Sequence, residues 1–525
     1  MSSWSIYTLL VALRVVIGSL LPGYVHPDEF FQGGQELFFG CPPLIPWEFE
    51  PHHAVRSIIP PTVMTWLPLK FYSWVVRTEM EQLTGLEILV IPRLFCGLAS
   101  VLAVDASVYF MTRRDSNTKA PTCSMWILAT SWPAWVITNR PFSNGLETLW
   151  LAVLLHAVTE SSTTSSTTFM DICIGILCSL GLFTRFTFVF FAIPVMILYL
   201  LQKLSAVGGI VQIASCSLGF SVSAGLIIMA DTLYFGGSSN WTSFITPLNA
   251  LLYNSRVDNL QHHGLHPRWT HVVVNMLILY GPMALLFYGK LASKLFNRAK
   301  EYPIDVIHQI CTWTVISGLT FLSLAPHQEP RFLSPLLVPL SVVMGKTAIW
   351  SSPNLRLIWI IFNLALFVVF GVLHQGGVVP TMLSSVVARD EPLSIMFHHT
   401  YMPPSFLSRR RQCTGEEVCT TSSCPQSPVN DLKGSNSYEL TRALELELQC
   451  KQEYSGHVHL VAPSLKLEDD LRLSTSDCRV GGDYSCELMW SYWPHLATED
   501  FPSFEGSLFD FIKSFELIIY KVACK

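Results

Sequence analysis

Charged residues are scarce in this chain of 525 residues. Asp, Glu, Lys and Arg together make up 14% of it, whereas hydrophobic residues make up 50% and the mean hydropathy is +0.41. A soluble domain normally carries about a quarter charged residues. The shortage therefore excludes an ordinary soluble protein and favours a chain that crosses a membrane several times.

Several short motifs that mark large enzyme classes are also absent. The chain has no P-loop, no GxGxxG and no HExxH, so it offers neither a nucleotide-binding loop nor a zincin-type metal site. It has no basic stripe of the kind that a nucleic-acid-binding protein needs. It also lacks Asp-x-Asp, with which enzymes that use nucleotide sugars commonly hold a metal and a diphosphate. We therefore expect no nucleic-acid partner, no metal and no cofactor.

Hydrophobic runs recur along the chain as far as Leu373. A membrane-spanning helix needs ~20 mostly apolar residues, and about eleven segments are candidates, although several are short or contain proline. They are Trp4–Leu21, Ile91–Met111, Thr122–Thr138, Leu146–Val158, Phe169–Leu182, Phe186–Leu201, Gly208–Ala230, Val272–Phe287, Val306–Leu324, Phe332–Met344 and Leu357–Leu373. The first run lacks a basic start and an A-x-A-like cleavage site, so we interpret it as a retained helix rather than a signal peptide. The sequence thus predicts an all-α polytopic membrane protein.

Basic residues concentrate in alternate connectors between these runs. Arg113–Lys119, Lys203, Lys290–Lys300 and Arg356 all fall on the cytosolic side if the amino terminus is cytosolic, as the positive-inside rule favours. The opposite, lumenal connectors hold nearly all the clusters of His, Asp, Glu and Pro. The run Ser57–Val76 contains three prolines and a lysine, and it would invert this arrangement if it spanned. We therefore predict that it forms an interfacial helix in a long first lumenal loop.

The carboxyl-terminal part of the chain is more polar. We predict a transmembrane domain over residues 1–400 and a small lumenal extension over residues 401–525. Seven of the 14 cysteines lie in the extension without a C-x-x-C pair, so disulfides with one thiol left over are expected rather than zinc. The other seven lie in or beside helices, where cysteine packs as a small apolar side chain. The last apolar run, FDFIKSFELIIYKV, is too charged to span and is expected to form an amphipathic helix or a strand.

Two carboxylates follow the first predicted span, in the stretch GYVHPDEFFQ from Gly23 to Gln32. Charges this close to a bilayer are costly and usually functional or paired. Asp28 and Glu29 follow a proline, so they lie in a turn or in the first turn of a helix. A carboxylate at a membrane surface from which water is excluded can act as a general base. The alternative is that Asp28 only caps a helix, and the loop alone leaves both interpretations open.

Other polar stretches follow on the same side of the membrane. In APHQEPRFLSPLLVPL, arginine predicts a forked contact to a lipid phosphate, and a Glu329–Arg331 ion pair is the alternative. NRPFSNGLET and LFTRFTF each carry one arginine. The run from Pro247 to Pro282 is rich in histidine. Its spacing fits a metal site poorly, so hydrogen bonding to a headgroup or sugar is favoured. NWT at Asn240 is a candidate glycosylation sequon.

Together these stretches resemble the dolichol-phosphate-mannose-dependent mannosyltransferases of GPI-anchor and N-glycan assembly, glycosyltransferase family 22. HPDEFFQ, RPFSNGLET, GLFTRFTF, the run from TPLNALLYN to RWTH, and HQEPRFLSPLLVPL occur in the family's order. HPDEFFQ and HQEPRF are most similar to the branch that adds a fourth, side-branching mannose in α1,2 linkage. YMPPSF at Tyr401 is similar to the same branch, more loosely. The resemblance implies a GT-C fold, an endoplasmic reticulum membrane location and a lumenal active site.

The resemblance also implies the substrates and the roles of residues. The donor would be dolichol-phosphate mannose and the acceptor a GPI-precursor glycolipid, joined by an inverting displacement that needs a single base. Asp28 would be that base, with Glu29 as second choice or as a group that orients the acceptor. Arg331 and His327, with Arg185 behind them, would hold the departing phosphate. Further substrate-binding candidates are His26, Gln32, Arg140, Asn249, His263, His266, Arg268 and Glu329.

Three alternatives remain from the sequence. Another member of the family could add an α1,2- or α1,6-linked mannose to a GPI or N-glycan precursor. A lipid transporter or scramblase would predict charges buried in mid-span and matching broken helices in two halves, but only Arg14 and Asp105 are strong mid-span charges and no repeat is evident. A non-catalytic subunit would not need the full set of carboxylates and arginines.

Overall fold

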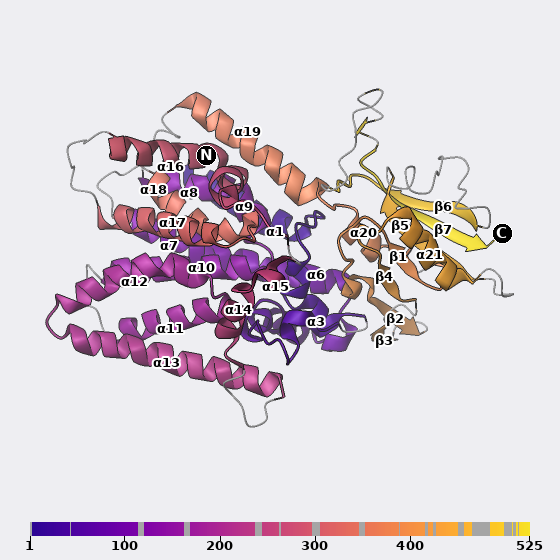
Figure 1. The fold of residues 1–525 in the computed structure, drawn as a ribbon, viewed down its shortest axis with the longest axis horizontal. Helices are drawn as coiled ribbons and strands as arrows, with labels where there is room; N and C mark the ends of the chain where they lie inside the picture. The colour runs from indigo at the N-terminus through magenta and orange to yellow at the C-terminus, as the bar shows by residue number, and fades with distance from the viewer. Residues whose placement is uncertain are drawn as a thin grey trace. The chain divides into compact units, whose positions relative to one another are not determined.

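A computed structural model shows a largely helical chain with a carboxyl-terminal sheet (Figure 1). It describes residues 3–41, 44–113, 120–161, 168–236, 244–261, 264–296, 305–345, 352–387, 389–414, 418–423, 427–449, 456–464, 484–497, 507, 511–512 and 514–524. The chain forms two compact units. Unit 1 comprises Met1–Ser19, Ile45–Met64 and Pro92–Ala365, and unit 2 comprises Leu20–Leu44, Thr65–Ile91 and Leu366–Lys525.

Unit 1 is built from helices. They are α1 (Ser3–Leu20), α4 (Ile59–Pro61), α6 (Gly85–Ser100, which begins in unit 2), α7 (Ala106–Thr112), α8 (Ala120–Thr130), α9 (Trp132–Val136), α10 (Ser143–Ser161), α11 (Thr168–Thr184), α12 (Phe188–Leu204), α13 (Gly209–Tyr234), α14 (Thr246–Asn254), α15 (Val257–Gln261), α16 (Met276–Phe296), α17 (Val306–Leu324), α18 (Leu337–Met344) and α19 (Pro353–Val368). Shorter 3₁₀ or π-helical turns link some of them. All eleven predicted spanning segments are therefore helical.

Five continuous helical stretches in the described part of the chain are long and apolar enough to cross a membrane. They are Gly85–Thr112, Gly209–Tyr234, His271–Lys294, Val306–Leu324 and Pro353–Leu373. Four shorter apolar helices are Trp4–Leu20, Thr168–Thr184, Phe188–Leu204 and Pro330–Met344. These helices confirm a multi-pass membrane protein, whereas the number of eleven spans stays a prediction.

Small residues let α11 and α13 approach each other closely. A Cβ atom added to Gly175 of α11 would lie 1.9 Å from the Cys216 carbonyl oxygen, and one added to Gly219 of α13 would lie 2.2 Å from that of Ile172. Helices in lipid gain little from apolar burial, so they associate through such close packing. The two glycines therefore fix this helix pair, which Figure 1 shows side by side.

The strongest mid-span charges neutralise each other inside unit 1. Arg14 of α1 and Asp105 lie 3.0 Å apart, and both are buried. The Tyr7 hydroxyl also donates a hydrogen bond to Asp105 over 2.6 Å. A buried charge is tolerated when it is paired and hydrogen-bonded, so this pair joins two helical segments inside unit 1.

Breaking this pair is expected to destabilise the protein. Asp105→Ala leaves the Arg14 guanidinium buried without its carboxylate, which typically costs about 3–5 kcal/mol. Replacing both residues together, Arg14→Met with Asp105→Leu, is expected to recover most of that loss because neither charge remains. Thermal unfolding of the detergent-solubilised variants measures both effects. A single variant as stable as the wild type would contradict the assigned role.

The run Ser57–Val76, predicted to be interfacial, is helical along most of its length. α4, a π-helical segment over Thr62–Trp66 and α5 (Leu67–Val76) follow one another. Phe71 and Trp74 of α5 are 64% and 73% exposed. Large apolar side chains on one helix surface suit the boundary between headgroups and acyl chains, so the interfacial location stays the prediction.

Unit 2 contains a mixed sheet with strand order β4–β1–β5–β7–β6. The strands are β1 (Ile395–Phe397), β4 (Val429–Asp431), β5 (His457–Pro463), β6 (Tyr484–Tyr492) and β7 (Leu517–Cys524), and β2 (Arg410–Thr414) with β3 (Val418–Ser423) forms a separate ribbon. β1 is parallel to β4 and β5, whereas β7 is antiparallel to β5 and β6. The all-α prediction thus fails for the carboxyl-terminal part, and the last apolar run supplies β7, one of the two expected forms.

One face of this sheet packs on the first loop. Alternate residues of a strand point to opposite faces, and Phe397, Val461 and Ile519 share a buried core with Tyr24 and Phe30. The helices of unit 2 around this core are α2 (Asp28–Phe31), α3 (Gln35–Phe39), α5 and α20 (Val378–Leu383). The parts of the first loop within Leu20–Leu44 and Thr65–Ile91 therefore fold in unit 2 together with the carboxyl-terminal part.

The other face of the sheet is covered by α21 (Ser437–Leu448). Leu440, Leu444 and Leu448 recur at the spacing of one helix face and are fully or almost fully buried. They pack against residues of the alternate register, among them Leu460 and Tyr520. Alternate residues of the strands are thus buried in two apolar cores, one on each face, and this burial stabilises the short sheet.

Cysteine bonding differs between the two units. Cys486 and Cys524 of the extension are disulfide-bonded, as predicted. Cys41 was expected to be a packed thiol, but it is also disulfide-bonded, because its loop folds together with the extension in unit 2. Cys178, Cys216 and Cys311, on the helices of unit 1, are thiols.

Candidate active site

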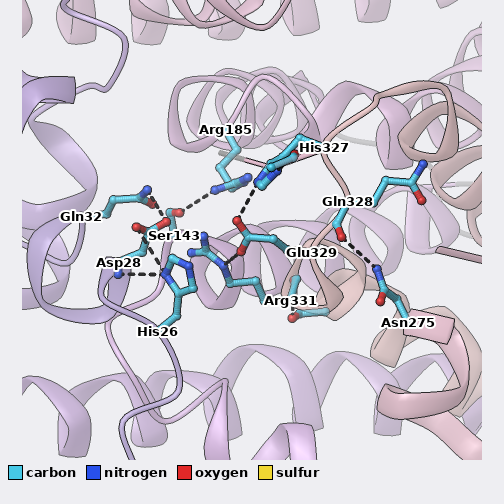
Figure 2. Close-up of polar contacts among 12 residues, drawn as sticks. His26, Asp28, Gln32, Ser143, Arg185, Asn275, His327, Gln328, Glu329 and Arg331 are labelled. Atoms are coloured by element: carbon cyan, nitrogen blue, oxygen red, sulfur yellow. Dashed lines mark hydrogen bonds and ion pairs between the residues drawn. The ribbon is translucent and has the colours of Figure 1, made fainter. Parts of the chain in front are cut away.

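His26, Asp28 and Gln32 form a compact polar group in unit 2 (Figure 2). Asp28 begins α2, and its carboxylate accepts a hydrogen bond from the side-chain amide of Gln32, one turn later. The backbone N–H of Asp28 donates to Nδ1 of His26 over 3.1 Å, and this nitrogen lies 3.5 Å from the Asp28 carboxylate. The sequence spacing of the motif alone thus brings these three side chains together.

The two neighbouring carboxylates of this motif differ in exposure. The Asp28 side chain is 19% exposed, whereas Glu29 is fully buried. Pro27 occupies the capping position of α2, and the N–H groups of Phe30 and Phe31 donate to its carbonyl oxygen. Asp28 therefore does not act as the helix cap, and its carboxylate is the more exposed of the two.

HQEPRF forms a second polar group, in unit 1. The Glu329 carboxylate accepts a hydrogen bond from Nε of Arg331 and lies 2.7 Å from Nε2 of His327 (Figure 2). Nδ1 of His327 lies 3.0 Å from the Gly264 carbonyl oxygen. Burial lowers the pKa of His327, but the hydrogen bond and charge of Glu329 outweigh it and raise that pKa above its ordinary value. The ion pair left open by the sequence is present, and the imidazolium is favoured.

Arg185, from the GLFTRF motif, lies against the same aromatic ring as Arg331. The guanidinium carbons of Arg185 and Arg331 are 5.0 and 5.5 Å from the centre of the Phe332 ring. Arg185 also lies 3.5 Å from the Glu147 carboxylate and donates to Oγ of Ser143 over 3.0 Å. Cations are stabilised over an aromatic face, so Phe332 fixes two guanidinium groups near each other.

Arg56 extends this group, although the sequence analysis did not select it. Its Nη1 donates to Oγ of Ser143 over 3.4 Å, and its Nε lies 3.3 Å from the Glu48 carboxylate. Ser143 therefore bridges Arg56 and Arg185. A lone arginine in a long loop carries no local signal of this contact. We refer to Arg56, Arg185, His327 and Arg331 as the cation cluster.

Gln328 was also missed, and it anchors the HQEPRF loop, which carries His327 and Arg331 of the cation cluster. The side chain is 1% exposed and accepts a hydrogen bond from the backbone N–H of His271 over 2.7 Å. Its amide donates to the carbonyl oxygens of Ala325 and Arg268, and Figure 2 shows its contact with Asn275. One side-chain amide therefore joins the HQEPRF loop to the histidine-rich run.

The predicted residues of the histidine-rich run lie in different environments. His266 is exposed, its backbone N–H donates to the Pro326 carbonyl oxygen, and its ring lies 5.8 Å from that of His327. The structure therefore brings His266 beside the cation cluster. Arg268 is exposed, and its backbone carbonyl oxygen accepts a hydrogen bond from the side-chain amide of Gln328.

Four other predicted site residues are not part of either polar group. The Asn249 amide donates to the Ala54 carbonyl oxygen over 3.1 Å, which ties α14 to the loop that precedes Arg56. Arg140 is fully buried in the turn before α10. His263 and Asn240 lie outside the residues that the structure describes.

One group in the described part of the chain could hold a metal ion, and it lies outside the histidine-rich run. Single ligand atoms of Glu50, His52 and His53 lie within 4.8 Å of one another. The His52 side chain is 69% exposed and lies 3.1 Å from Glu50. Three mostly exposed ligands resemble an ordinary surface contact, so we assign no chemistry to them.

Known proteins with similar sequences agree on one family. The model of the Alg9-like mannosyltransferase family matches residues 5–430. GPI mannosyltransferase 4 of Candida albicans is 31% identical over 94% of this chain and 95% of its own. GPI mannosyltransferase 4 of Saccharomyces cerevisiae is 31% identical over 80% of this chain and 79% of its own.

The fold is also found in a solved structure of low sequence identity. ArnT from Cupriavidus metallidurans, bound to undecaprenyl phosphate, superposes with a TM-score of 0.54 and 10% identity, over 99% of this chain and 98% of that one. This likeness confirms the predicted GT-C fold. The sequence resemblance to family 22 is confirmed as well. The chain belongs to the Alg9-like mannosyltransferase family and is a glycosyltransferase.

Proposed function

We propose that this enzyme transfers mannose from dolichol-phosphate mannose to the third mannose of a GPI precursor, in α1,2 linkage, at the lumenal side of the endoplasmic reticulum membrane. The relatives named GPI mannosyltransferase 4, which align with most of the chain, support this acceptor. The observation that carries the chemistry is the cation cluster. It presents fixed guanidinium groups of the kind that bind phosphate.

The proposed reaction is a single displacement. The acceptor hydroxyl oxygen attacks C1 of mannose while the bond from C1 to the phosphate oxygen breaks, and its electron pair leaves with the phosphate. The hydroxyl proton passes to the carboxylate of Asp28. One displacement inverts C1, so the β-linkage of the donor becomes an α-linkage in the product. No covalent enzyme intermediate and no second base are needed.

The cation cluster would stabilise the leaving phosphate. Arg56, Arg185 and Arg331 are each close to a glutamate, so protonation of His327, which its raised pKa favours, would give the group an excess of positive charge. Charge grows on the phosphate in the transition state, and prepositioned donors stabilise it without reorganising. His266, whose ring lies beside that of His327, would add a further hydrogen-bond donor for the phosphate.

An apolar cavity offers room for the dolichol chain. It has a volume of about 420 Å³ and lies between α11, α12, α13 and α14 of unit 1. Phe186, which lines it, is the residue after Arg185. An isoprenoid chain in this cavity would have its headgroup end next to the cation cluster, which supports a lipid-linked donor.

The side of the membrane is inferred from charge and from cysteine chemistry. Disulfides persist in oxidising compartments such as the endoplasmic reticulum lumen. Cys41 lies in the loop that carries Asp28, and Cys486 and Cys524 lie in the extension. Disulfides in these segments favour the lumen for both, in agreement with the basic connectors assigned to the cytosol.

A lipid profile of cells that lack the protein tests the acceptor. Loss of the enzyme is expected to leave GPI precursors with three mannoses and to remove those with four, and re-expression should restore them. An N-glycan precursor that stops short, with GPI precursors unchanged, would instead assign the enzyme to another branch of the family.

The reaction is expected to proceed without divalent metal. A single phosphate is held by arginines in this proposal, so chelation removes nothing that the chemistry needs. Purified enzyme should transfer mannose from dolichol-phosphate mannose equally with EDTA or with added Mg²⁺ or Mn²⁺. Strict dependence on a divalent ion, or direct use of GDP-mannose, would contradict the proposed donor site.

Donor binding is expected to weaken as pH rises. The pKa of His327 is raised, so its positive charge is present at low pH and is lost as pH increases through that pKa. The KM for the donor should therefore rise over this range, while His327→Gln should show a high KM with a flatter pH dependence. Initial rates at several pH values measure both. An unchanged pH profile in the variant would assign the titration to another group.

A further inference from the structure

Inside unit 2, residues 401–409 of the carboxyl-terminal part lie along the first loop. The Tyr24 hydroxyl donates a hydrogen bond to the Met402 carbonyl oxygen over 3.0 Å. The backbone N–H of Cys41 donates to Oγ of Ser405 over 2.6 Å. These contacts join segments far apart in the sequence, and the reaction described above gives them no role.

Tyr401 lies at the centre of this contact. Its ring centre is 5.6 Å from that of Tyr24, 6.2 Å from that of His26 and 5.4 Å from that of His374. His374 is fixed in turn, because its Nδ1 donates to the Tyr24 carbonyl oxygen over 2.9 Å. The ring of Tyr401 therefore restricts how His26 can turn. His26 is the residue that accepts the backbone N–H of Asp28.

Ser405 supplies a second connection. Its hydroxyl donates to the carboxylate of Glu36, which also accepts the N–H of Phe406 over 3.4 Å. Glu36 lies on α3, immediately after the turn that ends α2, and is 2% exposed. Burial raises the pKa of Glu36 to about 7 despite these bonds. A buried polar group needs its partners, so α3 has one favoured position against this segment.

We propose that Tyr401 and Ser405 are positioning residues for Asp28. Tyr401 would fix the His26 ring from one side, and Ser405 would fix α3 from the other. Together they would hold the short helix α2, which carries Asp28, in the orientation that proton transfer requires. Residues 401–409 would thus contribute to catalysis by orienting Asp28. This inference rests on the proposed function, because it takes Asp28 to be the base.

Tyr401→Ala tests the first contact. A base displaced by about 1 Å can cost on the order of 10²-fold in rate, so we expect kcat to fall about 10- to 10²-fold. The KM values for donor and acceptor should stay within about twofold, because no substrate contact is removed. Tyr401→Phe keeps the ring and should retain activity within about threefold. Tyr484→Ala, in the core beneath α21, is the control for loss of a buried aromatic side chain elsewhere in unit 2.

Ser405→Ala tests the second contact with a closely matched control. Ser408 has similar burial and lies in the same segment, but its hydroxyl donates to the Ser405 carbonyl oxygen, within the segment itself. Ser405→Ala should lower kcat about 3- to 10-fold, the range expected for loss of one orienting contact. Ser408→Ala should change it less than about twofold. Hydrogen exchange of residues 24–39 should accelerate in Tyr401→Ala and Ser405→Ala and in neither control.

Three results would overturn the inference. These are an unchanged kcat in both variants, a rise in KM with kcat intact, and unchanged hydrogen exchange. Asp28→Asn, measured beside them, separates this failure from that of the proposed function. An inactive Asp28→Asn with active Tyr401→Ala and Ser405→Ala would refute only the positioning role. An active Asp28→Asn would refute the base itself, whatever the exchange shows.

Discussion

Asp28→Asn is expected to lose about 10²–10⁴-fold in kcat, the usual contribution of general-base catalysis. An amide cannot take the proton of the acceptor hydroxyl, yet it has nearly the same size as the carboxylate. The amide can still accept the hydrogen bond from Gln32. Folding and donor affinity should therefore change little. Initial rates with purified enzyme, beside donor-binding and thermal-unfolding measurements, give all three quantities.

The neighbouring carboxylate supplies the matched control. Glu29 is fully buried, so Glu29→Gln is expected to act through packing and to lower kcat less than Asp28→Asn does. A larger loss in Glu29→Gln would transfer the role of base to Glu29. Near wild-type rates in both variants would refute a carboxylate base in this loop.

Arg331→Lys is expected to lower kcat/KM for the donor about 10- to 10²-fold. Lysine keeps the positive charge but loses the planar fork that binds a phosphate through two parallel hydrogen bonds. It also loses the flat surface that lies against Phe332. Arg185 also lies against the Phe332 ring, and Arg185→Lys should lower kcat/KM for the donor by a smaller factor. Rates at varied donor concentration separate donor use from turnover.

Arg256→Lys is the matched control for these substitutions. Arg256 is an exposed arginine of unit 1 that lies between α14 and α15 and belongs to neither polar group. It should retain wild-type rates. Arg331→Lys with unchanged donor kinetics would contradict the forked contact of Arg331 to the phosphate, since charge alone would then be enough.

The sequence predicted those features that depend on nearby residues. Apolar runs gave the helices, because a segment in lipid must satisfy its own backbone hydrogen bonds. His26, Asp28 and Gln32 lie within one motif, so their grouping follows from the local chain. Glu329 and Arg331 are likewise neighbours, and the sequence could name their ion pair as an alternative.

Features that depend on distant residues were not predictable in this way. Arg56 joins Arg185 only through Ser143, and no local pattern marks that bridge. Tyr401 reaches His26 because the sheet of unit 2 packs on the first loop. Short strands with both faces buried look like any apolar run, so the sequences of β5 and β7 show no clear alternation of polar and apolar residues. The disulfide at Cys41 was missed for the same reason.

The packing of the first loop against β7 has a consequence for biosynthesis. Tyr24 and Phe30 emerge from the ribosome long before Leu517 and Ile519 of the same core, because most of this sequence lies between them. Contacts of such long sequence separation form slowly and leave apolar surface exposed in the meantime. The apolar core that the HPDE loop shares with β7 therefore stays incomplete until β7 has been synthesised. A nascent chain interrupted before that strand would present an exposed core to quality control rather than a partly active enzyme.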